Sequence, residues 1–254
     1  MISKPLSVVI PVFEEAGNLE QLHKEIDTTL GSCESLEIVY VDDGSRDETA
    51  SVLERLRSDE RVRVVFHETR CGQSAALYSG VRHAACERVV TLDGDGQNDP
   101  ADIPALLAAA SEYGGDAPGL LVTGNRTHRR DGWLRRIASR VANSVRKRVL
   151  GDDTPDTGCG IKTFRRADFL ELPYFDHMHR FLPALFLRSG GHVVSVDVAH
   201  RPRGSGQSKY GINDRLWTGI VDMLGVMWLM RRHPKTGGNF GVGRADARTG
   251  VERE

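Results

Sequence analysis

Short apolar runs alternate with amphipathic segments along the first half of this chain. Runs bounded by polar turns predict strands at residues 6–12, 36–41, 61–66, 88–92 and 119–124. Apolar residues at helical spacing predict helices at about 18–30, 45–58, 72–85 and 100–113. Ser45 with Glu48 predicts a capping box at the second helix. This alternation is typical of an α/β fold with a mostly parallel central sheet flanked by helices.

Polar loops follow three of the predicted strands directly, at residues 11–15, 42–43 and 93–95. In parallel sheets, ligands bind beyond the carboxyl ends of the strands. We therefore expect these three loops to lie along one edge of the sheet and to form the functional site.

The stretch VVTLDGDGQNDP, residues 89–100, places three acids directly after an apolar strand. Carboxylates this close repel one another unless a proton or a cation intervenes. Asp93, Asp95 and Gln97 offer the oxygen ligands that Mg²⁺ or Mn²⁺ prefers. Asp, Gly and Asn also favour turns, so a polar turn without a metal is the alternative for this stretch taken alone.

Composition narrows the class of protein. The chain has 254 residues, 39% of them hydrophobic and 27% charged, which fits one large globular domain or one domain with an appendage. The net charge of −1 gives no bulk attraction to polyanions, and we expect no nucleic-acid partner. Basic residues are nevertheless concentrated at 126–148, where nine Lys or Arg accompany one acid.

The cysteines and the amino terminus favour a cytoplasmic protein. None of the four cysteines is at CxxC spacing, so we expect reduced thiols rather than a zinc site or a redox motif. The first apolar run is too short for the core of a signal peptide.

The carboxyl-terminal part divides into two segments beyond a catalytic domain expected at residues 1–212. The apolar segment 216–230 would span about 22 Å as a helix, short of a bilayer core of about 30 Å. Its tryptophans and flanking basic residues favour an amphipathic helix, expected at 213–232, that lies on a membrane or contacts a partner. An ordinary core helix is the alternative. Residues 233–254 are rich in Gly and polar residues and are expected to be disordered.

No G-x-G-x-x-G follows the first strand and no P-loop occurs, so a nucleotide would be held in another way. Four motifs resemble those of family-2 glycosyltransferases, and more narrowly the dolichol-phosphate mannose synthase group. They are VVIPVFEEAGN (8–18), VDDGSRDET (41–49), DGDGQNDP (93–100) and RGSGQSKYGI (203–212). The resemblance covers about residues 5 to 232. It implies a GT-A fold. It also implies an inverting, metal-dependent transfer of a hexose, with mannose favoured, from a GDP- or UDP-sugar to a polyprenyl or dolichyl phosphate.

The resemblance also implies roles for residues on the donor side. Pro11, Phe13 and Glu15 match the motif that lines the nucleotide site. Asp43 matches the acid that accepts a hydrogen bond from the nucleobase, while Asp42 would fix the loop. In this context Asp93, Asp95 and Gln97 become the metal ligands, and Asp95 is assigned a catalytic role.

Further roles fall on cationic residues. A phosphomonoester acceptor is already anionic near neutral pH, so cations matter more than a general base. Arg126 follows the fifth strand and is expected to contact the donor. Arg135 and Ser139, four residues apart on one helix face, resemble the acceptor-phosphate clamp, with Arg135 also assigned a catalytic role.

The R-x-x-G-x-S-K pattern places three more residues in a loop expected to close on the donor. Arg203 would contact the donor, Ser208 the acceptor, and Lys209 the donor during catalysis. The alternative to a phosphate-binding role for the basic run 126–148 is that it forms the solvated face of a helix whose apolar stripe packs on the core.

Other functions stay open on the sequence alone. A family-2 transferase acting on a saccharide or protein hydroxyl would need a carboxylate base, for which Asp156 in DTGCGIKTFRR (156–166) is the candidate. A non-catalytic nucleotide-sugar-binding subunit is a third possibility. A lipid acceptor would require peripheral docking on the cytoplasmic face of a membrane, on the membrane surface itself or through a small membrane protein.

Overall fold

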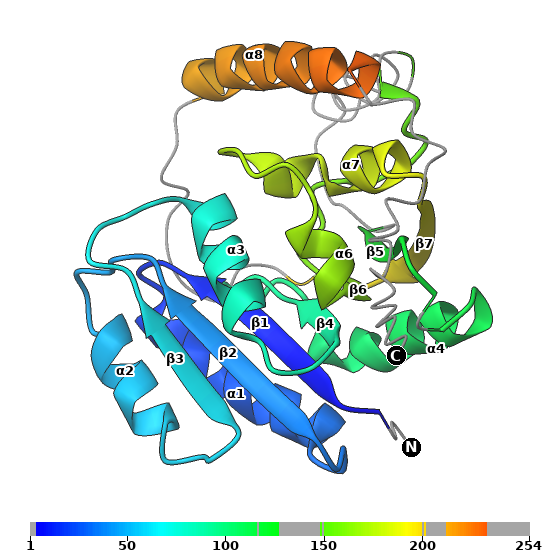
Figure 1. The fold of residues 1–254 in the computed structure, drawn as a ribbon. Coiled ribbons are helices and arrows are strands. Elements are labelled where there is room, and N and C mark those ends of the chain that lie inside the picture. Colours follow the sequence, from blue (N-terminus) through cyan, green and yellow to red (C-terminus); the bar gives the residue numbers. More distant parts are fainter. Residues whose placement is uncertain are drawn as a thin grey trace, which may run out of the picture.

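The computed structural model describes residues 4–115, 117–126, 148, 150–199, 201 and 212–232, with the side chains of 212–218 and 220 left out. Seven strands form one sheet in the order β3-β2-β1-β4-β6-β5-β7 (Figure 1). Their bounds are β1 Leu6–Val12, β2 Leu36–Asp42, β3 Val62–Phe66, β4 Arg88–Thr91, β5 Leu120–Arg126, β6 Lys162–Arg165 and β7 His192–Val198. The five predicted strands are confirmed.

Most of the sheet is parallel, as the sequence predicts. β1 pairs in parallel with β2 and β4, β2 with β3, and β5 with β7. The exception is β6, which is antiparallel to both of its neighbours, β4 and β5. The sequence analysis did not identify β6 or β7. β6 has four residues, two of them cationic, and β7 is a partly exposed edge strand whose short polar and apolar alternation, HVVSVDV, was the available signal.

Helices cover both faces of the sheet (Figure 1). They are α1 Ala16–Leu30, α2 Thr49–Leu56, α3 Gln73–His83, α4 Ile103–Glu112, α6 Arg166–Leu170, α7 Leu182–Arg188 and α8 Ile212–Arg231, with 3-10 turns η1 Pro100–Asp102 and η2 Met178–Arg180. Alternate residues of β1 point to opposite faces, so Val8 and Ile10 pack in the core with α1 and α4, whereas Val9 packs with α3 and α7. Two apolar layers therefore enclose the sheet and fix its carboxyl edge.

The predicted capping box at α2 is wrong. α2 begins at Thr49, and Glu48 at its N-cap makes no side-chain capping bond. The Ser45 hydroxyl instead accepts the backbone N–H of Glu14 at 2.9 Å, while the Ser45 N–H donates to Asp42 Oδ1 at 3.0 Å. Ser45 joins the loops after β1 and β2, and these long-range bonds outweigh the local capping pattern.

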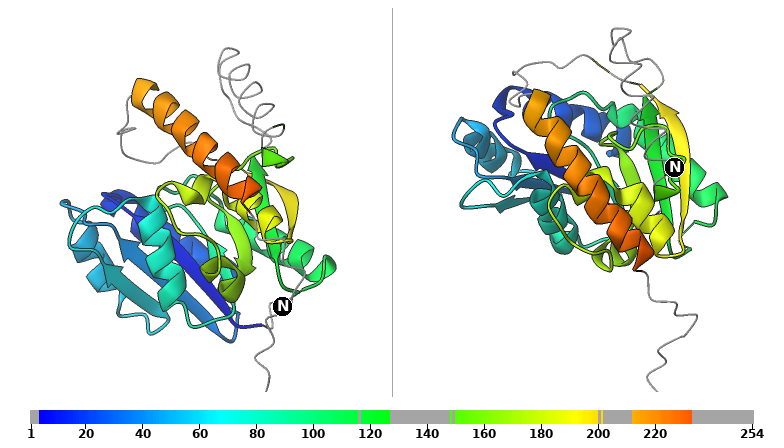
Figure 2. Two further views of the ribbon diagram at one scale, coloured as in Figure 1. Left: turned by 45° about the horizontal axis from the view of Figure 1, so that its top comes forward. Right: turned by 90° about the horizontal axis from the view of Figure 1, so that it is seen from above.

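α8 lies across one side of the molecule, over the segment that contains α7 (Figure 2). Val226 is buried against that segment, and Arg188 Nε donates to the Leu229 carbonyl at 3.1 Å. The opposite face exposes Val221, Leu224 and Trp228, which are 52%, 55% and 59% exposed. The described residues contain no helix with the length and apolarity needed to cross a bilayer.

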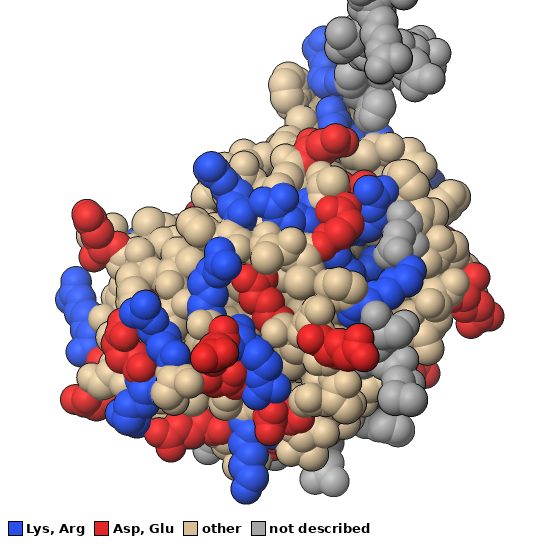
Figure 3. Space-filling view, turned by 60° about the horizontal axis from the view of Figure 1, so that its bottom comes forward, with Lys and Arg blue, Asp and Glu red and all other residues tan. Residues whose placement is uncertain are grey.

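The face of the molecule turned away from α8 carries many charged side chains. Acids and bases are interspersed over the described residues of that face (Figure 3). Surface ion pairs such as Arg55–Glu20 at 2.7 Å are of this kind. The mixture agrees with a net charge of −1 and contrasts with the apolar strip on α8.

Candidate active site

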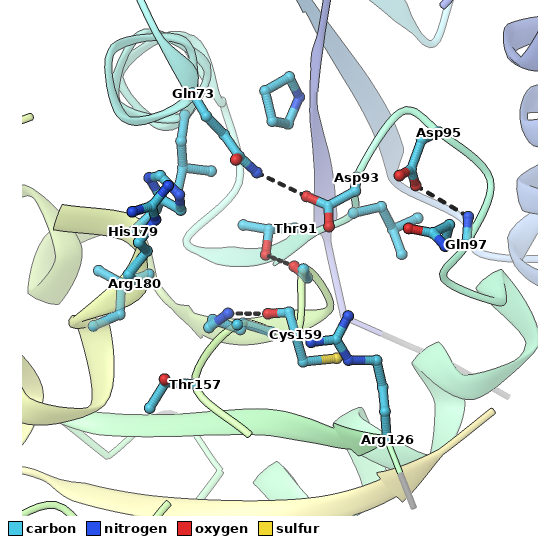
Figure 4. A pocket seen from close by; sticks show the side chains of 17 residues that line it. Gln73, Thr91, Asp93, Asp95, Gln97, Arg126, Thr157, Cys159, His179 and Arg180 are labelled. Atoms are coloured by element: carbon cyan, nitrogen blue, oxygen red, sulfur yellow. Dashed lines mark hydrogen bonds between the residues drawn. The ribbon is translucent and has the colours of Figure 1, made fainter. Parts of the chain in front are cut away.

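A cavity of about 780 Å³ opens at the carboxyl ends of β1 and β4 (Figure 4). Its wall is completed by the segment that leads into the antiparallel strand β6 and by η2. The lining residues are Pro11, Gln73, Leu77, Thr91, Leu92, Asp93, Asp95, Gln97, Arg126, Thr157, Gly158, Cys159, Gly160, Lys162, His179, Arg180 and Leu182. A cavity therefore lies at the carboxyl edge of the sheet, where the functional site is expected.

The predicted metal ligands lie together in this cavity. Asp93 follows β4, and Asp95 Oδ1 accepts the backbone N–H of Gln97 at 3.1 Å, which holds the turn between them. Burial and the Asp95 charge raise the pKa of Asp93 to about 6. Two carboxylates that repel each other beside an amide are a donor set that fits Mg²⁺ or Mn²⁺.

Asp93 is fixed by contacts from distant parts of the chain. Its Oδ1 accepts from Gln73 Nε2 at 2.9 Å (Figure 4), and its backbone N–H donates to Asn98 Oδ1 at 3.3 Å. Gly160 lies directly against its carboxylate, where a Cβ would collide with the side chain. The Gly160 carbonyl is anchored in turn by Thr91 Oγ1 at 2.6 Å. These bonds orient the first acid of the metal pair.

A buried cation next to this acid was not predicted. Lys162, at the start of β6, is 4% exposed, lines the cavity and donates from Nζ to the Cys159 carbonyl. Burial lowers its pKa, whereas the nearby Cys159 and Asp93 raise it. The sequence showed only an isolated lysine in a short strand, so this position could not be separated from a surface lysine.

Arg126, which is expected to contact the donor, lines the cavity, and its partner is Asp156. Arg126 Nε and Nη2 donate to the two carboxylate oxygens of Asp156 at 2.5 and 2.9 Å. The side chains are 12% and 9% exposed, so this is a bidentate ion pair largely shielded from solvent. Both oxygens of Asp156 are engaged by this cation, which counts against its service as a general base.

A second cavity of about 530 Å³ lies at the carboxyl ends of β2 and β3, against the loop after β1. Phe13 lines it, and the Arg70 guanidinium stacks on the Phe13 ring at 4.2 Å from the centroid. Asp42 lines this cavity as well. An aromatic ring, a cation and an acid together offer a stacking surface and hydrogen-bonding groups for a planar base.

Asp43 points elsewhere. It is 3% exposed and its oxygens accept the backbone N–H groups of Cys71 and Gly72, each at 2.8 Å, with His67 Nδ1 at 2.9 Å. Asp42 is equally buried at 3% exposed, and its Oδ1 accepts the Ser45 N–H at 3.0 Å, so it fixes the loop as expected while also lining the cavity. The role of Asp43 toward a nucleobase stays a prediction.

The other residues with predicted donor or acceptor roles are in different positions relative to the two cavities. Pro11 lines the larger cavity. Glu15 lies at the start of α1, where its Oε2 accepts from Asn18 Nδ2 at 2.6 Å, and it lines neither cavity. Arg135, Ser139, Arg203, Ser208 and Lys209 lie outside the described residues, so their roles stay predictions.

Two further groups in η2 face the larger cavity and were not predicted to function. His179 Nδ1 lies 2.8 Å from the Ser74 hydroxyl, and Arg180 follows it on the same wall (Figure 4). Burial lowers the pKa of His179 to about 3, helped by the neighbouring Arg180 charge, so the ring is neutral near pH 7. In the sequence this segment, HMHR, does not match the HExxH pattern of a zinc site and gives no other signal of a functional role.

The chain is similar to a known family and to known proteins. Residues 7–172 match the family described as Glycosyl transferase family 2. An undecaprenyl-phosphate 4-deoxy-4-formamido-L-arabinose transferase of Edwardsiella ictaluri is 36% identical over 213 residues, 82% of this chain and 63% of that protein. A dodecaprenyl-phosphate galacturonate synthase of Rhizobium johnstonii is 34% identical over 94% of this chain and 71% of that protein. The chain thus spans less than two thirds of the length of the first of these relatives.

The fold has solved counterparts. Glucosyl-3-phosphoglycerate synthase from Mycobacterium tuberculosis, in complex with Mn²⁺, UDP and glucosyl-3-phosphoglycerate, superposes with a TM-score of 0.65 at 20% identity, covering 92% of this chain and 82% of that one. A complex of the same protein with Mg²⁺ and UDP gives a TM-score of 0.60. The expected GT-A-like fold, a mostly parallel sheet flanked by helices, is confirmed.

Proposed function

The chain belongs to glycosyltransferase family 2, and from this premise we propose that it transfers a sugar from a nucleoside diphosphate to a polyprenyl phosphate. The observation that carries the proposal is the pairing of Asp93 and Asp95 at one cavity with a stacking surface at the next. A nucleotide sugar has the same two parts, a planar base and a diphosphate that requires a cation.

The larger cavity would hold the diphosphate and the sugar. Asp93, Asp95 and Gln97 would bind Mg²⁺ or Mn²⁺, which when bound neutralises the charge of the leaving diphosphate. Support comes from the M. tuberculosis neighbour, whose complexes contain UDP with Mn²⁺ or Mg²⁺. Phe13 and Arg70 would stack on the base, and Asp42 is the acid we propose for its polar edge.

The proposed acceptor rests on the state of the one candidate base named above, Asp156, within the described residues. A hydroxyl acceptor needs a carboxylate to take its proton, and the candidate Asp156 is bound to Arg126 through both oxygens. A phosphomonoester needs no such step because its second pKa is about 6. The relatives named above act on undecaprenyl and dodecaprenyl phosphates, which agrees with this choice.

For the donor sugar we propose a chemical class and not a single sugar. The resemblance to dolichol-phosphate mannose synthases predicts a hexose, and mannose in particular. The relatives carry names for a formamidoarabinose and for galacturonate, and neither name includes mannose. We therefore propose a pyranose donor linked to UDP or GDP and leave mannose as one member of the test panel.

A lipid acceptor also requires a route to the membrane. We propose that α8 lies on the membrane surface with its exposed strip of Val221, Leu224 and Trp228 in the interface. Arg231 and Arg232 are exposed at the end of the same helix, where they would face anionic headgroups. Docking through a small membrane protein is the alternative use of the same strip.

The test is a transfer assay with purified protein. Labelled UDP- and GDP-sugars, including mannose, glucose and galacturonate, are supplied with Mn²⁺ or Mg²⁺ and a short-chain polyprenyl phosphate, and label is counted in the organic phase. Metal-dependent label that disappears in Asp95→Ala would support the proposal and identify the sugar. Donor binding without transfer would favour a hydroxyl acceptor or a non-catalytic subunit. Absence of both would contradict it.

A further inference from the structure

We propose that His179 and Arg180 form a subsite for the phosphate of the acceptor, on the side of the cavity opposite the metal ligands. The inference rests on the proposed function and adds residues to the same site. Both residues come from η2, a turn of three residues that precedes α7. Figure 4 shows them across the cavity from Asp95 and Gln97.

The hydrogen bonds around His179 fix its protonation. The Ser74 hydroxyl accepts the backbone N–H of His179 at 3.2 Å and lies 2.8 Å from its Nδ1. Ser74 is 1% exposed, and Nδ1 is the acceptor its hydroxyl proton meets among the described residues. Nδ1 therefore accepts, and the ring proton resides on Nε2. The imidazole is a fixed neutral donor.

Arg180 supplies the charge. Its guanidinium lines the cavity and makes no hydrogen bond or ion pair with any residue in the described part of the chain. The other two cations of this wall are already engaged, Arg126 by Asp156 and Lys162 by the Cys159 carbonyl. A guanidinium offers five donors arranged to match an oxyanion. Arg180 is therefore the cation among these three that has its donors available for a ligand.

The geometry of the reaction determines which oxyanion this is. In a single displacement with inversion, the nucleophile and the leaving diphosphate lie on opposite sides of the anomeric carbon. The diphosphate is proposed to lie at Asp93 and Asp95, so the attacking oxygen belongs across the cavity from them. His179 and Arg180 occupy that side, which places a neutral donor and a cation beside the attacking phosphate (Figure 4).

The same segment is attached to α8. His177, two residues before His179, lies with its Nδ1 2.9 Å from Asp222 Oδ2 of α8. The two side chains are 29% and 16% exposed, so the contact is partly shielded. A lipid phosphate that follows α8 from the membrane surface would reach η2 first. The connection gives the subsite a position between the proposed membrane contact and the metal ligands.

The experiment compares variants that remove the same charge at two places. Arg180→Met and Arg180→Lys are compared with Arg82→Met, because Arg82 is exposed at the far end of α3. Farnesyl phosphate is titrated into each protein in the presence of UDP and Mn²⁺, and UDP is titrated alone with Mn²⁺. We expect Arg180→Met to weaken farnesyl phosphate binding at least about tenfold, with Arg180→Lys recovering part of the loss. UDP affinity should stay within about threefold in all variants.

Each outcome decides the inference. Wild-type affinity for farnesyl phosphate in Arg180→Met would overturn the subsite and leave the proposed function intact. A wild-type protein that binds UDP but no farnesyl phosphate would overturn both. If Arg180→Met instead weakened UDP binding and left farnesyl phosphate binding unchanged, Arg180 would belong to the donor site and the acceptor subsite would be wrong. His179→Ala should weaken farnesyl phosphate binding severalfold, and His179→Gln, which keeps a donor, should weaken it less.

Discussion

Gly160 is the position where one methyl group should remove the metal site. It lies on the segment before β6, against the carboxylate of Asp93. A Cβ at this position would approach Asp93 Oδ2 and Cγ to less than 3.0 Å and would lie 2.6 Å from Asn98 Oδ1. The backbone cannot easily retreat, because the Gly160 carbonyl is held by Thr91 Oγ1 at 2.6 Å. In Gly160→Ala the Asp93 carboxylate must move.

The size of the movement determines the effect. An ordinary carbon–oxygen contact needs more than 3.0 Å, so the carboxylate would shift by roughly 1 Å. Metal–ligand distances in a well-formed site agree with their standard values to within about 0.2 Å. Asp93 would therefore be lost as a ligand. Displacing even an outer partner costs about 10- to 100-fold in metal affinity, and we take that range as the minimum for Gly160→Ala.

The assay has a matched control two residues away. A Cβ on Gly158 would lie 3.4 Å from Arg126 Nη2 and 3.7 Å from Asp156 Oδ1, which are tolerable contacts. Mn²⁺ affinity is measured by calorimetry for Gly160→Ala, Gly158→Ala and wild type, with circular dichroism to confirm folding. Folded Gly160→Ala that binds Mn²⁺ as wild type would refute the assignment of Asp93 as a ligand. Equal losses in both variants would refute the steric argument.

Three further outcomes follow from the same structure. The folded His179 has a pKa of about 3 against 6.5 when unfolded, so stability should fall as pH drops below 6.5. Urea unfolding should show wild type losing about 1.4 kcal/mol relative to His179→Gln between pH 7.5 and 5.5, and parallel curves would contradict this. Leu224→Ser with Trp228→Ser should reduce sedimentation with anionic liposomes about tenfold or more at unchanged melting temperature, since both side chains are exposed; unchanged sedimentation would exclude α8 as the contact. Asp156→Asn should lower the free energy of unfolding by about 2 kcal/mol or more, because it leaves Arg126 without its anion, yet retain transfer. Complete loss of transfer with normal donor binding would restore Asp156 as a base.

The sequence by itself determined the local elements and the metal motif. A buried strand imposes a run of apolar residues and a helix imposes a period of 3.6, so β1 to β5 and α1 to α4 could be identified from residues near one another. Asp93, Asp95 and Gln97 lie within five residues, so the sequence shows oxygen ligands suited to a divalent cation, and the family resemblance favoured the metal over a polar turn. Such features need no knowledge of distant contacts.

The tertiary structure alone decided which distant side chains complete the site. β6 is too short and too charged to carry a strand pattern, yet its antiparallel insertion between β4 and β5 brings Gly160 and Lys162 to the cavity. The Arg126–Asp156 pair joins residues 30 positions apart, and the Ser74–His179 contact joins residues 105 apart. Long-range pairing depends on how the elements pack, and no local periodicity records it.

The two acids of VDDGS illustrate the same division. The sequence identified Asp42 and Asp43 as a polar loop at a strand end, where a ligand is expected. Only the tertiary structure showed that the Asp43 carboxylate is held by the Cys71 and Gly72 N–H groups, while Asp42 lines the cavity and accepts the Ser45 N–H. Adjacent residues at the end of a strand point in opposite directions, and the packing of the following loop decides which backbone groups each carboxylate meets.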